Sequence, residues 1–349
     1  MTGWRTPELT VLGRVFAGLS MSLIAGAAAA AEPGGQGVVQ VPSMFAAAST
    51  PAGIIADYSV LVFGICAAIF VVVAGLIIVT VVRFRSRPGD DDREPPQVYG
   101  SNQVELAWTV VPVLIVILLS LVTARNILAL QKDERPEGWL PVTAIGHQWW
   151  WEFHYPEQGI TTANELHLPV GRPTFFDLES QDVIHSFWVP QLSGKTDLIP
   201  NRTNHLWVDP FEPGVYVGQC AEYCGTQHAQ MLLRVVVHTP RGFESWLAHQ
   251  RTEAVMSPGV AEGRRLFEST ACVNCHTVRG TDADGRFGPD LTHLMSRATI
   301  GAGVASNDRA HLLEWVTDPD HFKPGVRMPA MKLGVKQVEQ VVDYLLTLK

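Results

Sequence analysis

The pattern of apolar and polar positions divides the chain into three regions. The first contains long uncharged apolar runs, the second alternates aromatic and β-branched residues with turn residues, and the third has apolar residues at helical spacing. This order predicts membrane-spanning helices, then a β-sandwich built from many short strands, then a small helical domain.

Two of the apolar runs are long enough to cross a bilayer, and we expect helices at about 57–82 and 104–127. The loop between them begins with an arginine cluster, Arg83–Arg87, whereas residues 32–57 contain no Lys or Arg. The positive-inside rule therefore places the loop in the cytoplasm and both flanking parts on the outer side.

The first 31 residues have a different apolar run, which is short, follows two arginines and ends in alanines before Glu32. This composition predicts a cleaved signal peptide at 1–31, and a third membrane helix is the alternative. The N-terminal segment and the helix hairpin then occupy 32–138.

Aromatic and β-branched clusters separated by Pro and Gly predict strands throughout residues 139–238. A helical and linker segment follows at 239–258, and a helical domain at 259–349. Near the start of that domain, Gly263 permits a close crossing with the last helix, with Phe267 and Tyr344 as expected contacts.

The net charge and the positions of the cysteines indicate which kinds of function the sequence supports. The net charge of -8 gives no indication of nucleic-acid binding. Of the five cysteines, four belong to two compact motifs, which argues for metal and haem chemistry rather than a disulfide framework. The fifth, Cys66, lies in an apolar run and is expected to be a packed thiol.

The first motif places five potential ligands within twelve positions: Cys220, Glu222, Cys224, His228 and Met231. Soft sulfur and imidazole ligands select copper over hard cations such as magnesium. Two cysteines four positions apart can bridge two metal ions if the loop folds back on itself. A structural zinc site is the alternative, although zinc rarely takes methionine.

The second motif, Cys272-Val-Asn-Cys275-His276, is typical of covalent attachment of a c-type haem. The thiols join the haem, and the histidine supplies one axial ligand. A methionine further along the chain is expected on the opposite side of the iron, and Met328 and Met331 are the candidates. We expect Met295 to serve in packing, and Trp315 either to contact a haem propionate or to pack in the core.

Together these motifs resemble subunit II of bacterial cytochrome c oxidase, in the caa-type variant with a fused cytochrome c domain. The resemblance runs from about residue 50 to the end. It implies a multidomain membrane protein with a two-helix transmembrane hairpin, a cupredoxin-like β-sandwich and an all-α class I cytochrome c domain. The family's usual G-x-x-M-P form selects Met328 as the second haem ligand.

The segment Asp182-Val-Ile-His185-Ser-Phe187 is similar to the family strand whose histidine binds copper. The resemblance thus implies a binuclear copper A centre with Cys220 and Cys224 as bridging ligands. The remaining implied ligands are His185, His228, Met231 and the backbone carbonyl of Glu222. The Glu222 side chain would also reach a magnesium or manganese ion shared with subunit I.

Two further residues gain roles from the resemblance. Trp149 matches the residue through which electrons enter copper A, whereas Trp151 is expected in the core and Trp150 fits either role. Glu105 matches a glutamate at the entrance of a proton pathway, and a favourable acid in the first turn of a helix is the alternative.

The chain departs from the mitochondrial members of the family at two positions. His154 and Gln181 stand where those members carry acids that help dock a basic soluble cytochrome c. The change weakens the case for a strongly electrostatic encounter. It suits a donor that is tethered to the same chain, because tethering raises the local concentration.

The resemblance implies the subunit at which electrons enter a proton-pumping terminal oxidase. Electrons would pass from cytochrome c through the haem and copper A to the haem of subunit I, where oxygen is reduced to water. The implied partners are oxidase subunits I and III and a cytochrome c donor, in a bacterial inner membrane with the copper and haem domains in the periplasm. Alternatives are a copper-A nitric oxide or nitrous oxide reductase, and a freestanding membrane-tethered electron carrier or copper-storage protein.

Overall fold

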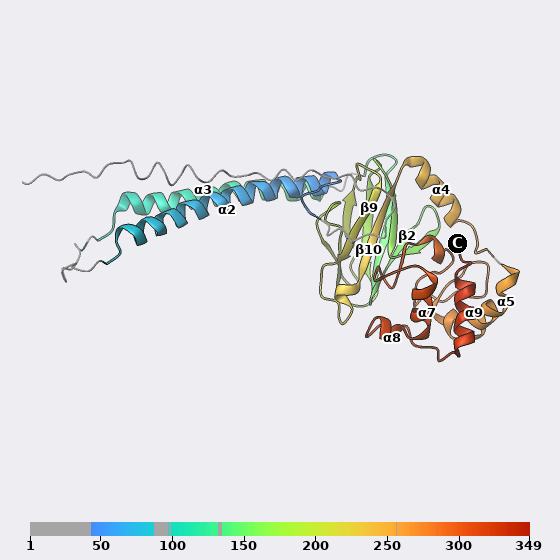
Figure 1. Ribbon diagram of the computed structural model, residues 1–349. Helices are drawn as coiled ribbons and strands as arrows, with labels where there is room; N and C mark the ends of the chain where they lie inside the picture. The colour runs from blue at the N-terminus through green and yellow to red at the C-terminus, as the bar shows by residue number, and fades with distance from the viewer. Residues whose placement is uncertain (1–42, 87–96, 98, 132–134, 256) are drawn as a thin grey trace, which may run out of the picture. The chain divides into compact units, whose positions relative to one another are not determined.

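The structure, a computed structural model, describes residues 43–86, 97, 99–131, 135–255 and 257–349 (Figure 1). The predicted signal peptide lies outside the described residues. The described part begins with a helix hairpin, continues into two β-sheets and ends in a group of short helices.

The hairpin consists of α2 (Thr50–Arg83) and α3 (Asn102–Leu130), both long and apolar enough to span a membrane. The hydroxyls of Tyr58 and Thr123, one on each helix, share a hydrogen bond of 2.7 Å. Most apolar side chains of both helices are exposed, as expected for surfaces that face lipid.

Helix α2 begins at Thr50, well before the predicted start at about 57. The cause is capping that the apolar pattern does not reveal. Ser49 accepts the amide of Ala52, and the carboxylate of Asp209 accepts the amide and hydroxyl of Thr50 at 2.7 and 2.6 Å. The indole of Trp207 donates to the carbonyl of Leu130 at the end of α3 (2.9 Å), so the β-sandwich holds the outer end of each helix.

Ten strands form the two five-stranded sheets of the predicted sandwich. In spatial order the first sheet contains β3 (Ile160–Ala163), β2 (Trp150–Tyr155), β1 (Leu140–His147), β5 (Thr174–Ser180) and β8 (Asn204–Val208). The second contains β4 (Glu165–Pro169), β10 (Leu232–His238), β9 (Gly214–Cys220), β6 (His185–Trp188) and β7 (Thr196–Leu198).

Strand β2 shows why this sequence makes a sandwich. Its residues alternate between half-buried and buried, which directs Trp151, Phe153 and Tyr155 into the core. Trp151 and Phe153 both meet Phe187 of the opposite sheet edge-on, with ring centroids 5.7 and 6.4 Å apart. Burial of such large rings from both sheets supplies most of the driving force for this domain.

Helix α4 (Pro240–Gln250) follows the sandwich directly and packs against it. Phe243 and Leu247 join the sandwich core, and the ring of Trp246 stacks on His167 at 4.4 Å. This first part of the expected linker segment therefore contributes to the sandwich core.

The C-terminal region is helical, apart from a short β-hairpin. Helices α5 (Ala261–Ser269) and α9 (Val335–Leu345) cross closely, since a Cβ atom on Gly263 would lie 1.9 Å from the carbonyl oxygen of Gln340. The rings of Phe267 and Tyr344 meet at 5.6 Å, which confirms the expected contact. The helices and strands are η3 (Pro258–Val260), α5 (Ala261–Ser269), α6 (Cys272–Cys275), η4 (Leu294–Ser296), β11 (Thr299–Ile300), β12 (Ala305–Ser306), α7 (Arg309–Thr317), α8 (Pro319–Phe322) and α9 (Val335–Leu345).

Candidate metal and haem centres

Three neighbouring strands bring the first group of candidate ligands together. His185 begins β6, Cys220 ends the antiparallel strand β9, and Met231 immediately precedes β10. Since β9 pairs with both β6 and β10, these positions lie at one end of the second sheet. The intervening loop, which includes the short helix η2 (His228–Gln230), carries Cys224 and His228.

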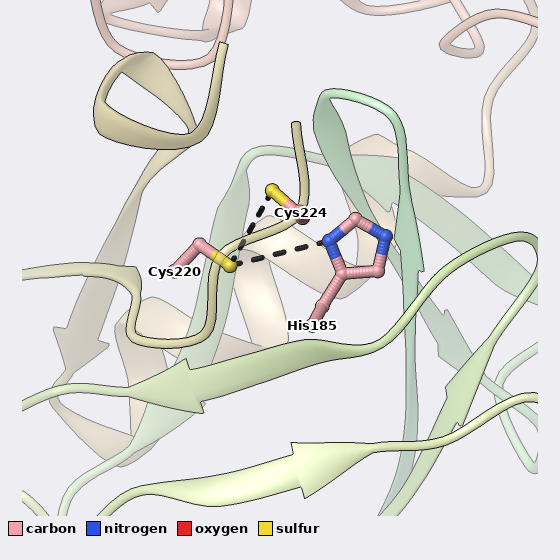
Figure 2. Close-up of side chains that lie close together, drawn as sticks. All are labelled: His185, Cys220 and Cys224. Carbon is pink, nitrogen blue, oxygen red and sulfur yellow. Dashed lines mark hydrogen bonds between the residues drawn. The ribbon is translucent and has the colours of Figure 1, made fainter. Parts of the chain in front are cut away.

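We call residues 220–231 the copper loop. Its ligand atoms and those of His185 converge. In Figure 2, dashed lines join the Cys220 sulfur to the Cys224 sulfur and to the ring of His185. The Cys220 sulfur lies 3.8 Å from the Cys224 sulfur and 4.0 Å from Nδ1 of His185. The Cys224 sulfur is in turn 3.8 Å from Nδ1 of His228 and 3.9 Å from Sδ of Met231.

These separations fit metal ligation. Two ligand atoms bound at about 2.0–2.3 Å to one tetrahedral ion lie roughly 3.3–3.8 Å apart. The cluster of His185, Cys220 and Cys224 is fully buried, so its donors face one another rather than water. The carbonyl oxygen of Glu222 also lies 3.1 Å from the Cys220 sulfur.

Hydrogen bonds and burial shift the pKa values of these side chains in different directions. The hydrogen bond between the two thiols lowers the pKa of Cys220, while the same pairing and burial raise the pKa of Cys224. Burial opposes a charge on His185, yet its hydrogen bonds to Asp182 and Cys220 outweigh that effect and raise its pKa. A bound metal ion would take the place of the thiol protons, because cysteine binds metals as the thiolate.

Asp182 is a functional residue to which the sequence analysis gave no role. Its carboxylate contacts Nε2 of His185 at 2.8 Å and leaves Nδ1 facing Cys220. Metal-binding histidines commonly donate their second nitrogen to a carboxylate in this way. The same carboxylate accepts the amide of Gln148 at 2.7 Å. The signal in the sequence is the Asp-x-x-His spacing.

Trp149 lies against the copper loop. Its indole Nε1 donates to the carbonyl of Cys224 at 3.0 Å, and the Gln148 side chain donates to the same oxygen at 2.8 Å. Trp151 is buried in the core, in agreement with its expected packing role. Trp150 instead stacks on His147 with 4.2 Å between ring centroids.

The remaining predicted site residues lie apart from this cluster. The Glu222 carboxylate is partly exposed and lies 3.9 Å from the ammonium of Lys195. Glu105 lies in the first turn of α3.

The second group of candidate ligands lines a cavity of about 820 Å³. Cys272 and Cys275 begin and end the one-turn helix α6, and His276 follows it. His276 donates from Nδ1 to the carbonyl of Pro289 at 2.8 Å, which leaves Nε2 available to a metal ion. Burial lowers the pKa of His276 and so favours the neutral imidazole that binds iron.

Met328 and Met331 both line this cavity, and so does Trp315. Met295 packs against the helical core, as expected. Arg297, to which the sequence analysis gave no role, also lines the cavity. Its guanidinium donates to the carbonyl of Asp290. The cavity's volume, mostly apolar lining and thiol-thiol-imidazole donor set fit a covalently attached haem.

Comparison with known proteins matches each region to a described family. Residues 39–125 match the transmembrane domain of cytochrome c oxidase subunit II, and residues 158–239 match its periplasmic domain. Residues 260–349 match cytochrome c. Cytochrome c oxidase subunit 2 of Alkalihalophilus pseudofirmus is 35% identical over 301 residues, which cover 84% of this chain and 86% of the relative.

The chain belongs to the cytochrome c oxidase subunit II family. Its Bacillus subtilis relative of the same name is 32% identical and matches 77% of this chain and 81% of its own length. Among solved structures, the periplasmic domain of the Bradyrhizobium japonicum oxidase subunit II is 30% identical, with a TM-score of 0.32. That match covers 33% of this chain and 96% of the other.

Membership confirms the resemblance inferred from the motifs. This oxidase subunit is a membrane protein with two apolar helices and a periplasmic domain, and it belongs to an oxidoreductase complex. Its subunit II and cytochrome c domains imply copper A and haem as cofactors, with cytochrome c as donor. Electrons enter the terminal oxidase at this subunit.

Proposed function

We propose that this subunit receives electrons at a c-type haem and delivers them through a binuclear copper A centre toward the oxygen-reducing subunit. The observation that carries the proposal is the convergence of five side-chain donors on the copper loop, with neighbouring donor atoms 3.8–4.0 Å apart. When bound, copper and haem supply one-electron redox chemistry.

The donor set favours two copper ions over one zinc ion. The structure gathers two thiols, two imidazoles, a thioether and a carbonyl, whereas a structural zinc site needs four ligands. Cys220 and Cys224 would bridge the ions, and the outer ligands would be His185, His228, Met231 and the Glu222 carbonyl. Thioether and thiolate ligands together are typical of copper.

For the haem, we assign covalent attachment to Cys272 and Cys275 and axial ligation to His276 and Met328. The bond from His276 to Pro289 fixes the imidazole with its other nitrogen free. Both Met328 and Met331 reach the cavity, and the spacing from Gly325 favours Met328.

Trp149 is the residue through which electrons would reach the copper loop. Its indole is one hydrogen bond from the carbonyl of Cys224, a proposed copper ligand. That bond also holds the ring in a fixed orientation, and rigid support around a redox centre limits rearrangement during transfer.

The remaining assignments follow the family. We propose subunits I and III as partners in a bacterial inner membrane, with the copper and haem domains in the periplasm. The partly exposed carboxylate of Glu222 would contribute to a magnesium or manganese site shared with subunit I, and Glu105 would stand at the entrance of a proton pathway. The domains would be the hairpin within 32–138, the copper domain at 139–238 and the cytochrome domain at 259–349.

The test is a metal, haem and spin-resonance analysis of the purified full chain beside two cysteine variants. We expect two coppers per chain with a mixed-valence signal, plus one covalent haem. Cys224→Ser should lose the mixed-valence signal and keep the haem. Cys66→Ser is the matched control, because Cys66 lies on α2 away from both centres. A single zinc in the wild type, or an unchanged copper signal in Cys224→Ser, would contradict the proposal.

A further inference from the structure

Lys323 is a buried lysine just before the proposed haem ligand Met328. Only 1% of it is exposed, although lysine is rarely buried in proteins. Burial lowers the pKa of its ammonium to about 8, so the group remains mostly charged at neutral pH.

The ammonium donates to three backbone carbonyls that come from both redox domains. The carbonyls of Gln230 and Gly301 each lie 2.8 Å from Nζ, and that of Trp149 lies at 3.4 Å. Gly301 belongs to the haem domain, whereas Gln230 and Trp149 belong to the copper domain. An ammonium has three donors, and here each faces one acceptor.

The residues around Lys323 strengthen this junction. The side chain of Gln227, a residue of the copper loop, donates to the carbonyl of Pro324. The Arg327 guanidinium bonds to the side chain of Gln148 and lies 5.9 Å from the Trp149 ring centroid. The segment that leads to Met328 therefore contacts the residues that surround the copper ligands.

Two further hydrogen bonds that do not involve Lys323 join the domains. The amide of Ala298 donates to the buried carboxylate of Glu165 at 2.7 Å, and the amide of Leu232 donates to the carbonyl of Ala302 at 3.0 Å. The haem cavity is accordingly lined by residues of both domains, among them His147, Trp149 and Trp150 of the copper domain.

We propose that Lys323 is a positioning residue. It fixes the haem domain against the part of the copper domain formed by Trp149 and Gln230. The inference rests on the proposed function, because it assigns Lys323 to the junction between the two centres. A haem domain docked in another arrangement, with Lys323 still buried, would leave its ammonium without the acceptors at Gln230 and Trp149. An incompletely paired buried charge is strongly unfavourable. Lys323 thus selects one docking arrangement among many, a role in specificity more than in affinity.

With both cofactors bound, one electron would pass from the haem held by this domain to the copper centre. The haem would be oxidised and the copper centre reduced by that electron, and no proton would move. Lys323 takes no part in the electron exchange and acts by holding both domains.

The test compares Lys323→Met with wild type in the assembled oxidase, by amide hydrogen exchange and by flash-induced electron transfer. Methionine is unbranched and of similar length but has no donor. We expect exchange at the Trp149 and Gln230 segments to rise by about 10-fold, and the first-order haem-to-copper rate to fall by about 10-fold or more. Transfer from copper onward and both reduction potentials should stay near wild-type values, a pattern that general damage to either centre would not produce.

Lys336→Met is the matched control, since Lys336 is an exposed lysine of the same domain, and it should change neither readout. The rate constant is measured only on chains that contain both centres, so incomplete loading does not alter it. If Lys323→Met does not accumulate, Lys323→Gln, which also removes the charge, takes its place. Wild-type exchange and transfer in either variant would overturn the proposal. Absence of the mixed-valence signal from the wild type would instead refute the proposed function.

Discussion

The copper loop and the haem cavity are built in opposite ways. Neighbouring donor atoms of the copper ligands already lie 3.8–4.0 Å apart, held at one end of three hydrogen-bonded strands. The haem ligands instead surround a cavity of about 820 Å³ and come from a one-turn helix and an irregular segment. The protein alone therefore brings the copper ligands together, whereas the haem ligands surround a space that a large cofactor would fill.

The difference shows how each domain depends on its cofactor. The sandwich has a closed aromatic core of its own around Trp151, Phe153 and Phe187. We therefore expect it to fold without copper. In the helical domain, core residues such as Phe267, Leu312 and Val341 line the haem cavity, so a bound haem would complete that core.

The largest expected effect comes from loss of haem attachment in the double variant Cys272→Ala/Cys275→Ala. Keeping the whole cavity open would cost at most about 20 kcal/mol at about 24 cal/mol per Å³. A small domain has only about 5–15 kcal/mol of stability. The helical domain should therefore unfold while the sandwich retains its mixed-valence copper signal, as limited proteolysis with mass spectrometry and spin resonance can show.

The matched control for this variant is Cys224→Ser, in which the helical domain should stay resistant to protease. The comparison fails if the double variant keeps a protease-resistant helical domain. It also fails if the copper signal is lost along with the haem.

A smaller effect is expected at the helix crossing of the haem domain. In Gly263→Ala the new Cβ would overlap the Gln340 carbonyl oxygen, which is backbone and cannot turn aside. Overpacking of this kind costs roughly 1–3 kcal/mol, and backbone overlap places it at the upper end. Thermal unfolding followed by haem absorbance should show the loss, with the copper signal unaffected.

Gly259→Ala provides the comparison for this substitution, because its Cβ would meet only Ser257 Oγ at 4.0 Å. Equal unfolding temperatures for the two alanine variants would show that the α5–α9 crossing is looser than the structure indicates.

The smallest predicted effect is a pH dependence confined to the sandwich. Burial, with help from His238 and Arg297, lowers the pKa of His167 from 6.5 to about 3. The unfolded chain takes up a proton below pH 6.5 and the folded chain does not. The stabilisation is therefore complete above pH 6.5 and declines as the pH falls from 6.5 toward 3, by about 2 kcal/mol at about pH 5.

His167→Phe should flatten this dependence, since phenylalanine does not titrate. Denaturant unfolding followed by tryptophan fluorescence is a suitable measurement, because Trp246 stacks on His167. Parallel pH curves for wild type and variant would show that the His167 and His238 pair does not control the acid response.

Much of the fold follows from local pattern. The apolar runs predicted α2 and α3, and alternation predicted strands such as β2 and β10. The start of α2 was placed too late, because its capping depends on Asp209, far along the chain. Periodicity does not report a contact between residues so distant in sequence.

The candidate sites divide in the same way. Closely spaced ligands such as Cys220 and Cys224, or Cys272 and His276, are visible as motifs. Asp182 received no role because its function depends on the geometry of His185. Lys323 was not singled out at all, because nothing in its own segment shows that carbonyls of another domain surround it.

The sequence by itself determined the kinds of centre in this protein, since ligand identity and short spacing specify which metal or haem chemistry is available. Only the tertiary structure decided how the centres are supported: which carboxylate orients His185, which carbonyl Trp149 contacts, and what Lys323 joins. Those contacts connect residues from separate strands and domains. Their geometry arises only when hydrophobic burial brings distant segments together and each buried polar group must find a partner.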